Sequence, residues 1–143
     1  MSPRSPLTDV EWEAYRDLRW RVLRAPWGQP RTADVDEDLP IVHAMITDDR
    51  GRAIAVGRLI VHSPVEAQVR SMATAEDMRG QGLGARIMAY LEQAARERGV
   101  ATIVLNARVD AVPFYARLGY QPTGPGPTLF DSVRHTAMHK QLS

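Results

Sequence analysis

The sequence predicts a single α/β (α+β) domain over residues 8–143, preceded by a flexible tail at residues 1–7. A strand, a glycine-rich loop, an amphipathic helix and a second strand follow one another from residue 68 to residue 106, which is the order of a βαβ unit with parallel strands. A β-hairpin precedes this unit, and a shorter helix and a last strand follow it. The length of 143 residues suits one such domain.

Composition and charge exclude several classes of function. The 18 Lys and Arg residues nearly balance the 17 Asp and Glu residues, and the formal net charge of +1 gives no long-range field for nucleic acid or an anionic membrane. The absence of cysteine excludes disulfides, thiolate metal ligands and a cysteine nucleophile. No segment approaches the ~20 apolar residues of a membrane span, and no signal-peptide pattern opens the chain. We therefore expect a cytoplasmic protein with a local site.

The first predicted element is a helix that begins at Thr8 and ends by Pro26. Thr8 and Glu11 have the spacing of a capping box. Tyr15, Leu18 and Val22 recur on one face, which predicts that this face is buried. The arginines between them are expected on the exposed face: Arg16, Arg19, Arg21 and Arg24.

A long turn-rich connection, "PWGQPRTADVDEDLP", follows this helix. It carries Trp27 and an acidic segment of four residues: Asp34, Asp36, Glu37 and Asp38. Loops of this length are often functional, so Trp27 and the acidic segment are candidates for contact with a substrate. The alternative is a solvated loop with its tryptophan packed on the core.

The segment "IVHAMITDDRGRAIAVGRLIVH" predicts a β-hairpin with its turn at residues 48–51. Gly57 in the second strand indicates a bulge or a close backbone approach. A further strand is predicted at residues 68–73. It is followed by the glycine-rich loop and a helix with Leu83, Ile87, Leu91 and Ala94 on one face, which ends at Gly99.

Three elements are predicted after Gly99. "ATIVLN" is wholly apolar until Asn106, which is typical of a strand buried on both faces. A short helix is expected from about Asp110 to Leu118. Alternating residues in "VRHTAMHK" predict the last strand.

The glycine-rich loop, "RGQGLGA", has the features of an anion site. Backbone N–H groups at a helix N-terminus bind phosphate without side chains. Residues 80–85 formally fit the dinucleotide pattern G-x-G-x-x-[GA], but "TAEDMR" separates them from the preceding strand, and too few residues follow for a doubly wound domain. No Gly-Lys-Ser or Gly-Lys-Thr follows, so the Walker pattern is excluded.

The same loop resembles the pyrophosphate loop of the GNAT superfamily of acyl-CoA-dependent N-acetyltransferases. Arg79-Gly80-Gln81-Gly82-Leu83-Gly84 matches the pattern [QR]-x-x-G-x-[GA]. "QVRSMAT" before it, "IVLNA" after the helix and then "AVPFYARLGYQ" match the order of the family's elements over residues 41–142. The resemblance implies a mixed, mostly antiparallel sheet with a splayed parallel strand pair, flanked by helices.

By this resemblance the cosubstrate is acetyl-CoA. Its pantetheine arm is expected along the strand that ends at Met72-Ala73-Thr74, with the thioester carbonyl near the Met72 or Ala73 N–H. Its pyrophosphate is expected on the loop amides. The cofactor-binding residues implied are Met72, Ala73, Thr74, Arg79, Gly80, Gln81, Gly82, Leu83, Gly84, Ala85 and Asn106.

By the same resemblance, a tyrosine on this helix lies near the sulfur, so Tyr115 is the expected general acid for the departing thiolate; a phenol with a pKa of ~10 is protonated at neutral pH. The alternative is that Tyr115 only packs the helix. Phe114 is assigned to the core. The general base is open. Many family members carry a glutamate in the strand before the loop, whereas this strand has Arg70 in its interior and Glu66 just before it. Glu66 is the candidate, and His43, His62, His135 or a water chain are the alternatives.

The resemblance implies transfer of an acetyl group from acetyl-CoA to a primary amine, by direct attack in a ternary complex. The alternative is an acyl-CoA-binding sensor without efficient transfer. The amine is expected on a small molecule or a peptide, and a homodimer is expected by analogy. We expect no metal, because His135 and His139 would lie ~13 Å apart in a strand.

Overall fold

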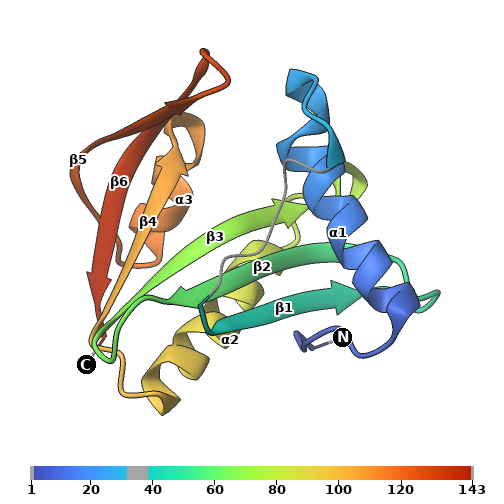
Figure 1. Cartoon of the computed structure of the whole chain (residues 1–143), viewed down its shortest axis with the longest axis horizontal. Coiled ribbons are helices and arrows are strands. Elements are labelled where there is room, and N and C mark those ends of the chain that lie inside the picture. Colours follow the sequence, from blue (N-terminus) through green and yellow to red (C-terminus); the bar gives the residue numbers. More distant parts are fainter. Residues whose placement is uncertain (1, 32–38, 143) are drawn as a thin grey trace.

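The structure is a computed structural model that describes residues 2–31 and 39–142. Six strands form one sheet in the order β1-β2-β3-β4-β6-β5, and three α-helices flank it (Figure 1). The predicted α/β class is confirmed. The elements are α1 (Asp9–Leu23), η1 (Ala25–Trp27), β1 (Ile41–Thr47), β2 (Ala53–Val61), β3 (Glu66–Thr74), η3 (Glu76–Met78), α2 (Leu83–Glu97), β4 (Thr102–Arg108), η4 (Val109–Ala111), α3 (Val112–Arg117), β5 (Gln121–Leu129) and β6 (Val133–Gln141).

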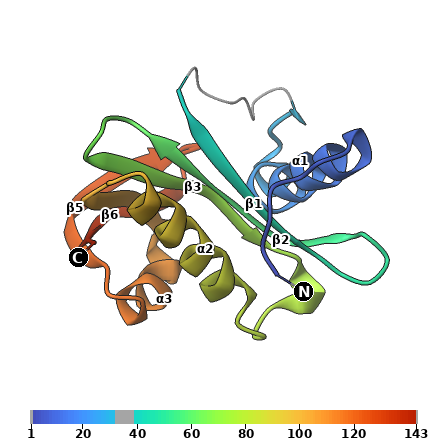
Figure 2. The ribbon, with the colours of Figure 1, turned by 90° about the horizontal axis from the view of Figure 1, so that it is seen from below.

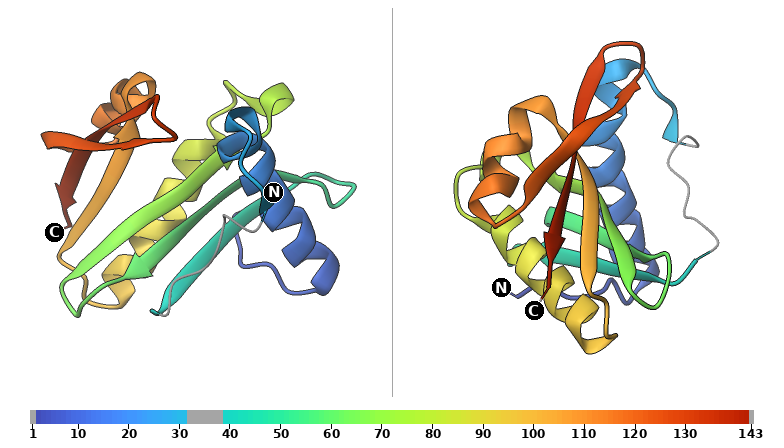
Figure 3. Two further views of the ribbon diagram at one scale, coloured as in Figure 1. Left: turned by 45° about the horizontal axis from the view of Figure 1, so that its top comes forward. Right: turned by 90° about the vertical axis from the view of Figure 1, so that its left-hand side faces the viewer.

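The sheet consists of two antiparallel halves joined by one short parallel pair. β3 and β4 pair only through residues 66–68 and 102–104. Beyond these residues the two strands diverge, so the halves open like a V (Figure 3). The splayed parallel pair expected from the family resemblance is therefore confirmed.

The helices cover both faces of the half formed by β1, β2 and β3. α1 lies on one face and α2 on the other (Figure 2). Tyr15 and Leu18 of α1 are completely buried, as the spacing predicts, and Ile87 and Leu91 of α2 are completely buried in the larger core. None of the described helices combines the length and the apolar character that a membrane crossing demands.

The predicted N-terminal cap is present. The Thr8 hydroxyl accepts from the Glu11 N–H at 3.1 Å, and the Glu11 carboxylate accepts from the Thr8 N–H, which completes a capping box. Before this helix, Arg4 exchanges two backbone hydrogen bonds with Met45 of β1. The flexible tail stays a prediction, and the acidic segment expected to contact substrate lies outside the described residues.

Two expectations about side-chain exposure are wrong. Arg19 is buried and its guanidinium lies over the Tyr15 ring at 5.2 Å, because α1 is covered on more than the face that the apolar spacing marks. β4 is not buried on both faces: its buried residues alternate with partly exposed ones, and Asn106 is exposed. One face of β4 packs on the core, and the other borders the space between the diverging strands.

The C-terminal elements differ from the prediction in extent. The helix expected from Asp110 is a 3-10 turn followed by α3 from Val112. β5 extends over nine residues to Leu129, although the sequence predicts no strand over most of this length. Its three prolines and two glycines are poor strand formers, and they are tolerated because β5 is the edge strand, with register shifts against β6.

Gly57 marks a bulge, as predicted. The register between β2 and β3 shifts at this position, so that Ser71 and Met72 together oppose it. A Cβ atom at Gly57 would lie 2.5 Å from Met72 Sδ and 2.7 Å from Ile87 Cγ2. Glycine is required here because β3 and α2 approach the β2 backbone too closely for any side chain.

Candidate functional site

A cavity of about 1020 Å³ lies between the diverging strands. Its walls come from β3 and β4, from the loop before α2, and from η4 and α3. The end of α1 and the β5–β6 hairpin contribute at its margin. The cavity exists because β3 and β4 separate after three paired residues, which leaves residues 69–74 of β3 without a partner strand on that side.

Ser71 bends β3 at the cavity wall. It has a φ of +58°, a conformation that non-glycine residues seldom adopt. Its hydroxyl accepts a hydrogen bond of 3.0 Å from Nε of the buried Arg58 on β2, and this bond stabilises the bulge. Met72, the next residue, has no register partner on β2 or on β4. The bulge therefore exposes a short stretch of strand backbone to the cavity.

The glycine-rich loop lies where α2 begins. Gly80 and Gly82 have φ values of +82° and +76°, so their backbone conformation requires glycine. Gly82 caps α2 without any side-chain hydrogen bond, which leaves the first N–H groups of the helix available to an anion. Gly84 has a different role, because a Cβ there would lie 3.2 Å from Phe114 Cζ, where α2 meets α3.

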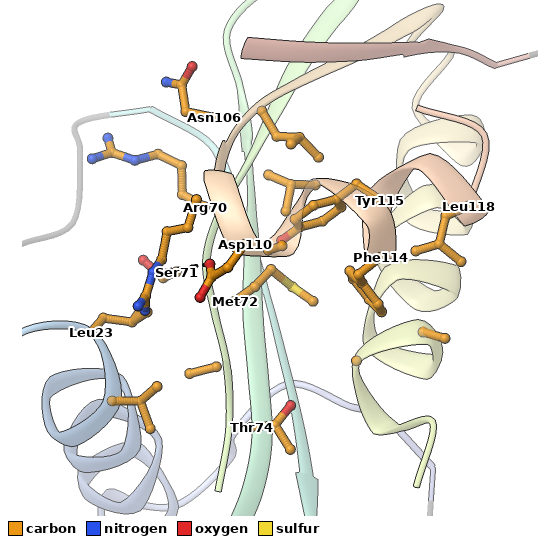
Figure 4. Close-up of a pocket in the computed structure, with 18 of the residues that line it drawn as sticks. Leu23, Arg70, Ser71, Met72, Thr74, Asn106, Asp110, Phe114, Tyr115 and Leu118 are labelled. Atoms are coloured by element: carbon orange, nitrogen blue, oxygen red, sulfur yellow. Dashed lines mark ion pairs between the residues drawn. The ribbon is translucent and has the colours of Figure 1, made fainter. Parts of the chain in front are cut away.

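Tyr115 reaches into the cavity from α3 (Figure 4). Its side chain is 8% exposed, and burial raises the pKa of its hydroxyl to about 12. Its ring contacts Phe114 and Tyr120 edge to face, with centroids 4.9 and 6.0 Å away. Phe114 is half-buried and packs against the core, as predicted, and it also lines the cavity.

Most of the residues expected to bind the cosubstrate line this one cavity. They are Met72, Ala73, Thr74, Arg79, Gly80, Gly82, Leu83, Gly84, Ala85 and Asn106. Gln81 does not line it; its side chain is exposed and contacts Met78 Sδ.

The candidates for the base are spread over the molecule. Glu66 does not line the cavity: it lies at the paired end of β3, ~20 Å along the strand from Met72. His62 hydrogen-bonds Gln68 at 2.8 Å and His43 hydrogen-bonds the Tyr15 hydroxyl at 2.8 Å, and neither lines the cavity. His135 does line it, with Nδ1 close to the carbonyl oxygens of Pro127 and Val133.

Several cavity residues were not identifiable from sequence spacing. Asp110, on η4, directs its carboxylate toward Ser71 (Figure 4). Arg24 and Arg108 also line the cavity. Trp27, which the sequence offered as a candidate for substrate contact, does not line it and stacks on Phe130. Only Asp110 had an available signal: it lies two residues after the end of β4, and the carboxyl ends of the parallel strands β3 and β4 lie on the same side of the sheet.

Metal binding has no support among the described residues, where no three His, Asp or Glu side chains converge on a common point. His135 and His139 both lie in β6, four residues apart.

Comparisons with known proteins identify the family. The model of the acetyltransferase (GNAT) domain matches residues 32–142. The chain belongs to this family. An uncharacterized acetyltransferase of Streptococcus pyogenes serotype M1 is 28% identical over 92 residues, and the match spans 64% of each chain. The chain thus spans slightly less than two thirds of the length of this curated relative.

Solved structures of an N-acyltransferase and an N-acetyltransferase share the fold of this chain. An acyl-CoA N-acyltransferase from Pseudomonas aeruginosa superimposes with a TM-score of 0.78 and 25% identity, over 94% of this chain and 92% of its own. The ribosomal-protein-S18-alanine N-acetyltransferase from Escherichia coli gives a TM-score of 0.76 with 24% identity, over 97% and 92% of the two chains, which shows the shared fold.

Proposed function

We propose that this GNAT protein transfers an acetyl group from acetyl-CoA to a primary amine, by direct attack of the amine on the thioester in a ternary complex. One observation carries the proposal. A single cavity contains the unpaired edge of β3, the glycine-rich loop at the start of α2, and Tyr115. These are the three parts that thioester aminolysis needs: a place for the donor, an anion site and a proton donor.

The donor is held at two places in this proposal. The N–H groups of residues 80–84 and the Arg79 guanidinium bind the pyrophosphate, supported by the α2 dipole. The pantetheine arm pairs with residues 69–74 of β3 like an added strand, because these residues lack a neighbour on β4. Asn106 faces this arm from β4, where its exposed amide can bond the pantetheine amides.

The thioester carbonyl then lies beside the bulge. A backbone N–H of Met72 or Ala73 stabilises the oxyanion that develops when the amine attacks. Tyr115 protonates the departing thiolate. A phenol whose pKa burial raises to about 12 is fully protonated at neutral pH, so it is available as a donor in every turnover.

The test has a binding step and a catalytic step. Acetyl-CoA should raise the melting temperature and NAD should not, because only a ligand of the folded state stabilises it. Acceptor-dependent thiol release is then followed with acetyl-CoA and a panel of aliphatic amines, amino acids and peptides. Tyr115→Phe should lower kcat by about 100-fold with little change in acetyl-CoA affinity, whereas Tyr90→Phe, outside the cavity, should change neither.

The outcomes are distinct. A melting temperature unchanged by any acyl-CoA would contradict donor binding. A shift without thiol release for any amine would instead indicate a protein that binds acyl-CoA without transferring the acyl group. An unchanged kcat in Tyr115→Phe would assign protonation of the thiolate to water or to another group.

A further inference from the structure

We propose that Asp110 receives the ammonium group of the acceptor and accepts its proton, which makes it the base of the reaction. This inference rests on the proposed acetyl transfer. Among the described residues that line the cavity, Asp110 is the only carboxylate. It lies on η4, between the end of β4 and the helix that carries Tyr115, five residues before that tyrosine.

The orientation of the two side chains supports this role. In Figure 4 the Asp110 carboxylate extends toward Ser71, at the β3 bulge, while the Tyr115 ring reaches into the cavity from α3. The bulge is where the proposed mechanism positions the thioester carbonyl. An amine bound at Asp110 would therefore approach the carbonyl carbon from the η4 side, with the thiol leaving toward Tyr115.

Asp110 has room for a ligand. Its side chain is 79% exposed, and its ion pair with Arg108 has 3.9 Å between Nε and Oδ1, which is too long for a hydrogen bond. The carboxylate is thus in contact with water and has space for a second cationic partner. It can therefore form an ion pair with an alkylammonium group and pass the accepted proton to solvent.

Among the described residues, the other charged side chains that line this part of the cavity are cationic. Arg24 lies at the end of α1, Arg70 on β3 and Arg108 on β4, and His135 lines the cavity from β6. A protonated amine is repelled by guanidinium groups and attracted by a carboxylate. Among the described residues of the cavity, Asp110 is thus the one that attracts an ammonium group, whereas the charged residues around it repel one.

His135 is the competing base within the cavity. The carbonyl contacts of its Nδ1 indicate that this nitrogen carries the proton, which leaves the Nε2 lone pair free. His135 can accept a proton, but a histidine does not attract the ammonium form that predominates for an aliphatic amine at neutral pH. Asp110 accounts for both binding and deprotonation, so the two residues are separable by experiment.

The ammonium group gives one proton to the Asp110 carboxylate, which releases it to water. The neutral nitrogen attacks the carbonyl carbon, the C–N bond forms, and the C–S bond breaks as the tetrahedral intermediate collapses. The thiolate takes the Tyr115 proton, and the second proton of the attacking nitrogen returns to that phenol through water. The net change is one proton released for each amide and thiol formed.

The experiment compares Asp110→Asn, Asp110→Glu, His135→Gln and Asp49→Asn, an exposed turn residue outside the cavity. The acceptor is the aliphatic amine of the panel with the fastest thiol release. At pH 7.5, Asp110→Asn should lower kcat/KM for this amine by about 100-fold. The loss should shrink as the pH approaches the pKa of the amine, and acetyl-CoA affinity should stay within about twofold of wild type.

Three further results complete the test. Asp110→Glu should keep part of the activity that Asp110→Asn loses, and Asp49→Asn should behave as wild type. A hydrazide is neutral at pH 7.5, so with a hydrazide as acceptor the kcat/KM of Asp110→Asn should fall less than about tenfold. Wild-type activity in Asp110→Asn, or an equal loss for amine and hydrazide, would overturn the inference. A pH-dependent loss in His135→Gln alone would assign the base to His135. Absence of thiol release in the wild type would instead refute the proposed function itself.

Discussion

Trp27 stacks on Phe130, with ring centroids 6.1 Å apart and ring planes inclined by 25°. Trp27 ends η1, just after α1, and Phe130 lies in the turn between β5 and β6. Arg24 lies over the Phe130 ring at 5.6 Å and Arg108 over the Trp27 ring at 4.9 Å. The two halves of the sheet pair directly through β3 and β4, and these contacts join them a second time, between the end of α1 and the turn of the β5–β6 hairpin.

This aromatic contact should couple the stability of the two halves. Trp27→Ala, Phe130→Ala and the double variant form a cycle in the free energy of unfolding, measured by urea denaturation. We expect a coupling energy of about 1 kcal/mol, because stacked aromatic pairs contribute about that much beyond their buried area. A control cycle pairs Phe130 with Trp20, whose indole donates to the Gln29 carbonyl at 2.8 Å. Equal coupling in both cycles would contradict a direct interaction.

Gly57→Ala should damage both stability and donor binding. The added Cβ would lie 2.5 Å from Met72 Sδ and 2.7 Å from Ile87 Cγ2, so the β3 bulge or α2 must move. We expect a loss of about 1–3 kcal/mol in the free energy of unfolding and weaker acetyl-CoA binding by titration calorimetry. Gly51→Ala is the control, because it strains a turn with a φ of +82° and leaves the bulge intact. Unchanged acetyl-CoA affinity in Gly57→Ala would show that the bulge does not position the donor.

The raised pKa of Tyr115 predicts a loss of stability at alkaline pH. Burial raises this pKa to about 12, whereas an unfolded tyrosine titrates near ~10. Below pH ~10 the tyrosine is protonated in both the folded and the unfolded state, so its ionisation does not change the free energy of unfolding. Between about pH 10 and 12 the unfolded chain loses the proton first, so the free energy of unfolding falls as the pH rises.

Tyr115→Phe should therefore flatten this decline. The slope between pH 10 and 12 should decrease by up to about 1.4 kcal/mol per pH unit, as measured by denaturation at a series of pH values. Tyr120 contributes with the same sign, since burial and the nearby Glu92 carboxylate raise its pKa too. Tyr90→Phe is the control, and the same slope in Tyr115→Phe and the wild type would refute the prediction.

Glu92 should be more costly to remove than an exposed carboxylate. It is buried, and it accepts hydrogen bonds from the Tyr120 hydroxyl at 2.9 Å and from Lys140 Nζ at 3.0 Å. Glu92→Leu should cost about 3 kcal/mol of unfolding free energy, because Lys140 keeps its charge without its partner. Adding Lys140→Met should recover part of that loss. A double variant less stable than Glu92→Leu would show that Lys140 is held mainly by the Leu118 carbonyl, 2.8 Å from Nζ.

Local sequence patterns were enough to predict helices with a periodic apolar face and positions that need a special backbone conformation. The Thr8 cap, the apolar stripe of α2 and the bulge at Gly57 each depend on neighbours within one or two turns or one strand, so the residue types indicate them directly. β5 was beyond this kind of prediction, since its prolines are tolerated only at the edge of a sheet whose strand order is not local. The prediction that Arg19 is exposed was wrong, because the charge of a side chain does not indicate which faces of its helix are covered by other elements.

The sequence by itself determined where a phosphate group is expected to bind, because the glycine-rich loop is contiguous and its conformation follows from its own glycines. The resemblance of this loop to the GNAT pyrophosphate loop then implied acetyl-CoA. Only the tertiary structure decided which residues share the cavity with that loop. Glu66 is distant from it and Asp110 is within it, since β3 and β4 pair at one end and separate at the other. The two strands belong to different halves of the sheet, with α1 and α2 packed on the first half and α3 beside β4 in the second, and no short segment of the chain encodes that arrangement.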